Sequence, residues 1–126
     1  MKLLSLCLAG TALLLSACST TIPDIIDPRT FRAQGNEPGW HIDLQNGHAS
    51  IVLNYGDTRY TSSAAQTLIG STQTRYSGQG PNGDWTLTVI KQECSDTMSD
   101  QHYEYTSILK TEGKTLRGCG IYLPQP

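Results

Sequence analysis

The sequence has few basic residues and no apolar run long enough to cross a membrane as a helix. Its 126 residues contain nine Lys and Arg against eleven Asp and Glu, a net charge of −2 with neutral histidine. Nucleic-acid binding needs clustered Lys and Arg to neutralise phosphates, so this balance argues against it. The main apolar stretch, residues 3–15, covers about thirteen residues. A spanning helix needs about twenty, so this stretch is too short to be one.

The sequence also lacks the short motifs that carry common chemistries. It contains no Gly-x-Ser-x-Gly elbow, no His-Glu-x-x-His pair and no phosphate-binding glycine loop. The three histidines are far apart and lack metal-ligand spacing. Counting from Asp96, Met98 and Gln101 stand where a calcium loop requires an oxygen ligand and a glycine. We therefore expect no enzyme activity, no metal site and no cofactor.

The N-terminus has the pattern of a bacterial lipoprotein signal. Lys2 supplies a positive n-region, the apolar stretch suits a helical h-region, and Leu15-Ser16-Ala17 precede Cys18 as in a lipobox. A thiol at this position can be alkylated by a diacylglyceryl group, and cleavage then leaves Cys18 as the new N-terminus. We predict a signal peptide over residues 1–17 and an acylated tether over residues 18–31. An ordinary secretory signal with a chance cysteine, or an uncleaved anchor, are the alternatives.

The predicted cleavage also bears on localisation. It leaves 109 residues (126 less 17), with eight Lys and Arg against eleven Asp and Glu, a net charge of −3. Without a polybasic patch for anionic lipid, membrane association rests on the acyl chains, and two or more chains anchor a protein stably. Ser19 replaces the Asp that retains enteric lipoproteins in the inner membrane. We therefore predict an outer-membrane lipoprotein whose single domain, residues 32–126, faces the periplasm.

The positions of the four cysteines predict their different roles. Cys7 lies in the predicted signal and Cys18 takes the lipid, which leaves Cys94 and Cys119. Two cysteines in an oxidising periplasm predict one disulfide. Closing a loop of about 25 residues stabilises a domain by roughly 3.5 kcal/mol in the chain-entropy model. A reactive thiol at Cys119, or a metal site using both sulfurs, are the weaker alternatives.

From residue 39 onward, apolar and polar side chains alternate and turn signals recur at short intervals, with no sustained helical stripe. We expect Tyr55 on the apolar face of its strand, and a loop or short helical turn at residues 64–71. The pattern predicts strands near 40–45, 51–55, 72–78 and 85–89, a hairpin of 103–111 with 114–123, and turns at Asn46-Gly47, 80–83 and Glu112-Gly113.

These strands predict an all-β fold. About seven strands in fewer than 90 residues must close on themselves or form two sheets, because one open sheet leaves an apolar face wet. Closure also removes exposed edges. We predict an antiparallel meander closed as a small barrel or half-barrel filled by side chains, with a two-sheet sandwich as the alternative.

Residues 31–40 form the first candidate binding segment. Asn36, Glu37 and Trp40 would offer a polar and aromatic surface to a sugar or peptide. Their structural interpretation is that Gly35-Asn36 and Pro38-Gly39 form turns, and that Trp40 starts the first core strand. The structural interpretation is the stronger one.

The second candidate is the loop from Ser95 to Gln101, which contains Asp96, Met98 and Asp100. If Cys94 holds one end rigid, this loop loses little entropy on binding. Its carboxylates favour a basic partner, as many lysozyme-like hydrolases are. The alternative is that both carboxylates bond only to their own loop.

Three motifs in order carry a resemblance: Arg-x-x-Gly-Asn-Glu-Pro-Gly-Trp at 32–40, Cys-x-Asp-x-Met-Ser at 94–99 and Gly-Cys-Gly at 118–120. This combination resembles an uncharacterised family of Gram-negative envelope lipoproteins and secreted domains, and covers residues 32–120. The resemblance implies that Cys94 and Cys119 are the motif cysteines, and it brings no assigned activity. Asp100 stands where Gly is common in that family. A more distant likeness, at the level of fold alone, is to META-type and lysozyme-inhibitor lipoproteins.

The sequence thus predicts a non-catalytic binding or envelope-maintenance module, attached to the membrane through Cys18, with no nucleic-acid partner. The expected partner is an envelope protein or a cell-wall hydrolase. Inhibition of a lysozyme-like hydrolase is the alternative function.

Overall fold

A computed structural model describes residues 29–96 and 100–124. Cys18 and the predicted signal helix lie outside these residues, as does Met98. Within the described ranges, no helix is both long and apolar enough to cross a membrane.

The described chain is almost entirely β-strand. The elements are β1 (Phe31–Asn36), β2 (Gly39–Gln45), β3 (His48–Leu53), a 3-10 turn η1 (Asn54–Gly56), β4 (Thr58–Ser63), β5 (Ala65–Leu68), β6 (Gln73–Gly80), β7 (Gly83–Ile90), β8 (Cys94–Ser95), β9 (His102–Tyr103), β10 (Tyr105–Thr111) and β11 (Lys114–Tyr122).

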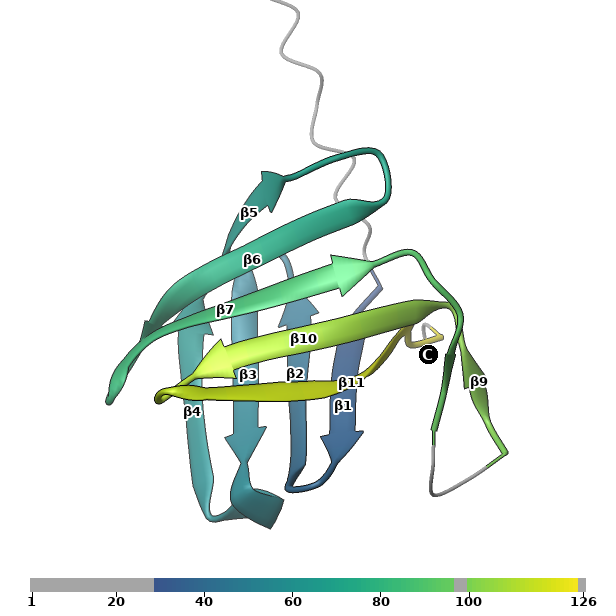
Figure 1. Cartoon of the computed structure of the whole chain (residues 1–126). Helices are drawn as coiled ribbons and strands as arrows, with labels where there is room; N and C mark the ends of the chain where they lie inside the picture. The colour runs from purple at the N-terminus through teal and green to yellow at the C-terminus, as the bar shows by residue number, and fades with distance from the viewer. Residues whose placement is uncertain (1–28, 97–99, 125–126) are drawn as a thin grey trace, which may run out of the picture.

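Nine of these strands form one antiparallel sheet in the order β4-β3-β2-β1-β11-β10-β7-β6-β5. Figure 1 shows β6, β7, β10 and β11 running across β1–β4, so that the sheet curls over its own inner face. The two ends of the sheet meet where β4 lies against β6 and the Trp85 indole donates to Ser62 Oγ at 3.0 Å. The predicted antiparallel, barrel-like fold is confirmed, and β8 and β9 form a separate two-stranded ribbon.

Two hairpin turns follow directly from the sequence. Asn46 and Gly47 both have positive φ, 51° and 75°, as the turn between β2 and β3 requires. Glu112 and Gly113 adopt φ of 52° and 74° between β10 and β11. Asparagine tolerates this region well, whereas glutamate is less common there, so the short β10–β11 connection imposes the conformation on Glu112.

The core fills the inside of the curled sheet. Alternate residues of each strand point inward, as the period of two dictates. The fully buried large side chains include Ile42, Ile51, Trp85, Leu87 and Leu109. At one end of the barrel, Phe31, Tyr105 and Tyr122 pack edge to face, with ring centroids 5.1–5.7 Å apart. Burial raises the pKa of nearby Tyr76 to about 12.

Strands β1 and β11 approach closely at glycines. A Cβ on Gly118 would overlap the carbonyl oxygen of Gln34, and one on Gly120 would overlap the Phe31 ring. Glycine is therefore required for steric reasons on both sides of Cys119, which itself points to the outer face.

Local expectations were wrong in three places. The first strand was expected to start at Trp40, but β1 comes before it. Gly35 and Asn36 were expected to form a turn, and instead they pair with β2. Residues 65–68 form β5, an edge strand whose exposed side chains show no alternation. Tyr55 lies in η1 with φ of 56° and is 74% exposed, because the strand ends at Leu53.

Candidate functional site

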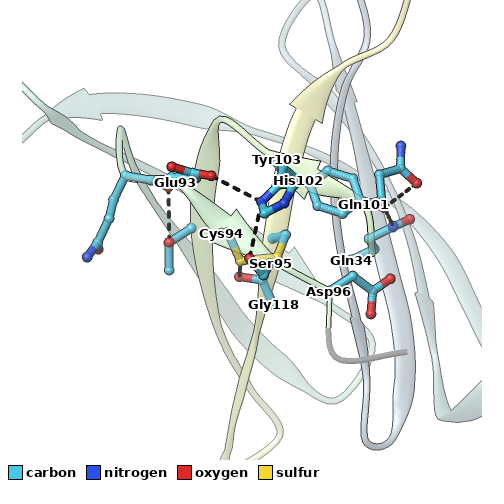
Figure 2. The surroundings of a disulfide bond; sticks show 12 residues. Gln34, Glu93, Cys94, Ser95, Asp96, Gln101, His102, Tyr103 and Gly118 are labelled. Carbon is cyan, nitrogen blue, oxygen red and sulfur yellow. Dashed lines mark hydrogen bonds and ion pairs between the residues drawn. A yellow bond between two sulfur atoms is a disulfide. The ribbon is translucent and has the colours of Figure 1, made fainter. Parts of the chain in front are cut away.

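The β8–β9 ribbon lies across the outer face of the barrel, and we call it the strap. A disulfide joins Cys94 in β8 to Cys119 in β11, with the two Cα atoms 5.5 Å apart (Figure 2). This confirms the predicted disulfide. Cys94 Sγ also lies 3.5 Å from the carbonyl oxygen of Gly118. The strap is thus covalently fixed to the strand that pairs with β1.

A buried tyrosine supports the strap from below. Tyr103 is opposite Cys94 in the ribbon and is buried between the strap and the barrel. Its hydroxyl accepts a hydrogen bond from Gln34 Nε2 in β1 at 2.8 Å and donates to Gln101 Oε1 at 3.2 Å (Figure 2). A buried hydroxyl with both a donor and an acceptor is fully satisfied, so Tyr103 fixes the strap at little cost.

A second side-chain bond ties the strap to the first motif. Asn36 Nδ2, at the end of β1, donates to Asp96 Oδ1, just after β8. The backbone N–H of Asp96 also donates to the Gln101 carbonyl at 3.2 Å. These bonds bring the predicted segments 31–40 and 95–101 into contact and hold the two ends of the strap loop together.

The outer side of the strap carries exposed polar groups. His102 Nδ1 lies 3.0 Å from Glu93 Oε1 and 3.3 Å from Ser95 Oγ (Figure 2). Both the histidine and the glutamate are mostly exposed, so this arrangement contributes little to stability.

An open cleft of about 520 Å³ lies between the strap and strands β1 and β11. Polar side chains, backbone and the disulfide line it, and carbon and sulfur atoms make up more than half of the lining surface. The lining residues are Gln34, Gly35, Asn36, Glu37, Cys94, Ser95, Asp96, Tyr103, Thr106, Thr115, Arg117, Gly118 and Cys119.

Acidic groups outnumber basic ones around this cleft. Glu37 and Asp96 line it, together with Arg117, and Asp100 is exposed on the strap loop. Asp96 is half-buried and engaged by Asn36, whereas Glu37 and Asp100 are exposed. The residues that line the cleft thus carry two carboxylates and one guanidinium.

A second hollow of about 320 Å³ lies on the other side of the β1–β2 turn, next to Tyr55 and Arg59. Gln34, Gly35 and Asn36 line both hollows. Trp40 borders this second hollow but is only 3% exposed and belongs to the core cluster. Its burial favours the structural interpretation of Trp40 over that of an aromatic binding surface.

The structure brings together most of the candidate site residues. Asn36, Glu37 and Asp96 share one cleft with Cys94 and Cys119. Trp40 is apart from them in the core, Asp100 is exposed on the strap loop, and Met98 lies outside the described residues.

Gln34, Tyr103 and Arg117 also belong to the site, although none of them was predicted from the sequence. Gln34 and Arg117 belong to it only because β1 pairs with β11, where Gln34 is opposite Cys119. Tyr103 is opposite Cys94 in a ribbon of two-residue strands. Neither pairing leaves a local pattern in the sequence. The one available indication was that Tyr103 follows the motif cysteine Cys94 by nine residues.

Within residues 29–96 and 100–124, no group of three or more His, Cys, Asp or Glu side chains is placed to hold a metal ion. No protein-family model matches this chain, and neither does any curated protein or any solved structure.

Proposed function

We propose that this protein is a lipoprotein anchored through Cys18 in the outer membrane, and that its barrel binds a basic partner protein at the strap cleft without catalysis. It acts there as a binding or envelope-maintenance module facing the periplasm. The lipobox before Cys18 supports the anchor, and the cleft geometry supports the binding role. The motif resemblance to envelope lipoproteins supports the same cellular setting.

The observation that supports the binding role is that segments distant in the sequence meet in one cleft. Segments 34–37, 94–96 and 115–119 are far apart in the sequence, yet they line one open polar cleft. The disulfide, Tyr103 and the Asn36–Asp96 bond fix the geometry of that cleft. A prearranged site loses less conformational entropy on association, which improves affinity.

The charge of the cleft supports a basic partner. Glu37, Asp96 and Asp100 outnumber Arg117 around it. Complementary charge speeds association and excludes acidic competitors. Inhibition of a lysozyme-like cell-wall hydrolase is the second candidate function, because an acidic loop held rigid beside a disulfide suits insertion into the cleft of a basic enzyme.

Capture from periplasmic extract tests the binding role. The double variant Asp96→Asn and Asp100→Asn removes two charges but keeps side-chain shape and an acceptor oxygen for Asn36. We expect partner capture to fall while the thermal unfolding temperature stays nearly constant, and Asp84→Asn, an exposed acid outside the cleft, to leave capture intact. Unchanged capture with a lower unfolding temperature would show that the loop is structural. If the partner is a hydrolase, loss of its activity on stoichiometric binding identifies the inhibitor function.

The anchor is tested separately at Cys18. Substituting Cys18→Ala should abolish incorporation of labelled palmitate and leave unprocessed precursor. Palmitate on that variant would refute the anchor and leave the cleft proposal standing.

A further inference from the structure

The hairpin between β5 and β6 carries two large apolar side chains that the domain does not cover. Leu68 is 71% exposed and Ile69 is 45% exposed. They lie at the end of β5, all of whose residues are exposed. The other exposed large apolar residue of the described chain is Tyr55, in η1 (Figure 1).

The backbone of this tip is ordered by its own bonds. The N–H groups of Ile69 and Gly70 donate to the Gln73 carbonyl at 3.2 and 3.4 Å. The Thr72 carbonyl accepts from the Lys91 N–H at 2.8 Å, which ties the tip to the end of β7. Leu68 and Ile69 are therefore presented by a defined turn.

The tip lies at the end of the barrel where the described chain begins. Antiparallel pairing puts Gln73 opposite Ile90, and Ile90 opposite Thr106 near the start of β10. Phe31, the first residue of β1, is opposite Tyr122 at the end of β11, which follows β10. Figure 1 shows the β5–β6 connection and the start of β1 on the same side, and the β1–β2 turn and η1 on the other.

The charge around the tip differs from that of the cleft. No Asp or Glu occurs between Asp57 and Asp84. Two exposed cations flank the tip, namely Arg75, which is opposite Thr67 in the β5–β6 ladder, and Lys91. An exposed acid, Glu93, follows Lys91 by two residues and pairs with His102 on the strap. Apolar side chains flanked by cations suit an anionic lipid surface, where the former enter the headgroup region and the latter meet phosphates.

We propose that the β5–β6 tip docks on the bilayer that holds the acylated N-terminus, with Leu68 and Ile69 entering the headgroup region. This inference rests on the anchor in the proposed function. Ten residues separate Cys18 from Arg29, and the eleven Cα–Cα steps between the two reach at most about 40 Å. A short tether gives an effective concentration of about millimolar, so a small apolar tip is sufficient for docking.

Docking at the tip would orient the domain. The cleft lies around Asn36 and Glu37, at the opposite end of β1 from Phe31. With the tip on lipid, the part of the cleft around Asn36 and Glu37 lies farther along β1 from the leaflet than the part at Thr106, which shares a row of the sheet with Gln73.

Quenching by brominated lipid tests the tip. The mature acylated chain carrying Ile69→Trp is reconstituted in phosphatidylethanolamine vesicles containing phosphatidylglycerol with brominated acyl chains. The native tryptophans, Trp40 and Trp85, are buried and supply a constant background. The matched control is Tyr55→Trp, another exposed apolar site, on the opposite end. We expect loss of fluorescence for Ile69→Trp and none for Tyr55→Trp, and adding Leu68→Ser should weaken the loss.

Equal loss at both sites, or loss at neither, would overturn the docking proposal. The mass of the purified chain reports acylation at Cys18 independently. If the chain proves unacylated, the same variants mixed with vesicles at millimolar lipid still report on the tip. Quenching of Ile69→Trp alone would then support docking without the anchor, and no quenching would refute it.

Discussion

The strap and the β5–β6 hairpin both project from the same barrel, but they are held in different ways. A disulfide, the Tyr103 hydroxyl and the Asn36–Asp96 bond fix the strap to β1 and β11. Strand β5 has only its ladder with β6, and every one of its side chains is exposed. The strap borders a cleft lined by acidic and other polar side chains, whereas the β5–β6 hairpin presents Leu68 and Ile69 and contains no Asp or Glu.

The difference fits the two kinds of surface proposed for this domain. Recognition of a protein partner depends on polar groups held at fixed positions, so extra cross-links are concentrated where the cleft is. Contact with lipid depends on apolar area and net charge and needs no fixed register. The proposed lipid contact would need only the short edge strand that presents Leu68 and Ile69.

Removing the disulfide should have the largest effect, because it breaks the covalent bond between the strap and β11. We expect Cys94→Ala to lower the free energy of unfolding by about 2–5 kcal/mol. The control Leu68→Ser, at the exposed tip, should change it by less than about 0.5 kcal/mol. Denaturant unfolding of both variants measures the comparison. An equal loss of unfolding free energy in the two variants would contradict the conclusion that the strap is held more firmly than the β5–β6 hairpin.

A glycine beneath the strap should be more sensitive than one at the tip. A Cβ on Gly118 would overlap the carbonyl oxygen of Gln34, so Gly118→Ala must push β11 from β1 and distort the cleft. We expect a loss of about 1–3 kcal/mol, as for other overpacked sites. Gly70→Ala meets no atom within 4 Å and is the matched control, with an expected change near zero. A tolerated Gly118→Ala would show that the cleft floor is not tightly packed.

The sequence predicted the elements with strong local signals. The turns at Asn46-Gly47 and Glu112-Gly113 formed as expected, as did the alternating strand around Trp85. The disulfide followed from counting cysteines. These features depend on neighbours along the chain or on redox chemistry, so they need no knowledge of the fold.

Features that depend on distant pairing were not predictable. Strand β1 contains Gly35 and Asn36, which locally indicate a turn, and only its ladders with β2 and β11 make it a strand. Strand β5 is exposed on both faces and so lacks an alternating pattern. The cleft could not be predicted either, because its walls are formed by β1 and by the two-residue strands of the strap, which are too short to leave a sequence pattern.

Raising the pH above about 10 should destabilise the domain through Tyr76 in β6, whereas changes near neutral pH should not act through this residue. Tyr76 is opposite Gln66 in the β5–β6 ladder, and burial raises its pKa to about 12 from an ordinary value of about 10. Above pH 10 the unfolded chain loses this proton before the folded chain does, so stability should fall as pH rises from about 10 to 12. Tyrosinate absorbance should show a late-ionising tyrosine that Tyr76→Phe removes. Ionisation of every tyrosine near pH 10 would contradict this.

The proposed recognition of a basic partner by the acidic edge of the strap cleft is tested most directly by measuring how the affinity for the captured partner depends on salt concentration. Glu37→Gln with Asp100→Asn removes two exposed charges at the cleft and on its strap loop, and Asp57→Asn with Asp84→Asn removes two exposed charges elsewhere. We predict that the first pair weakens binding several-fold and lowers its salt dependence, since edge charges act mainly through association rate. The second pair should leave both nearly unchanged. Equal loss in the two pairs would mean that only net charge matters, and unchanged affinity in the first pair would place the partner elsewhere on the barrel.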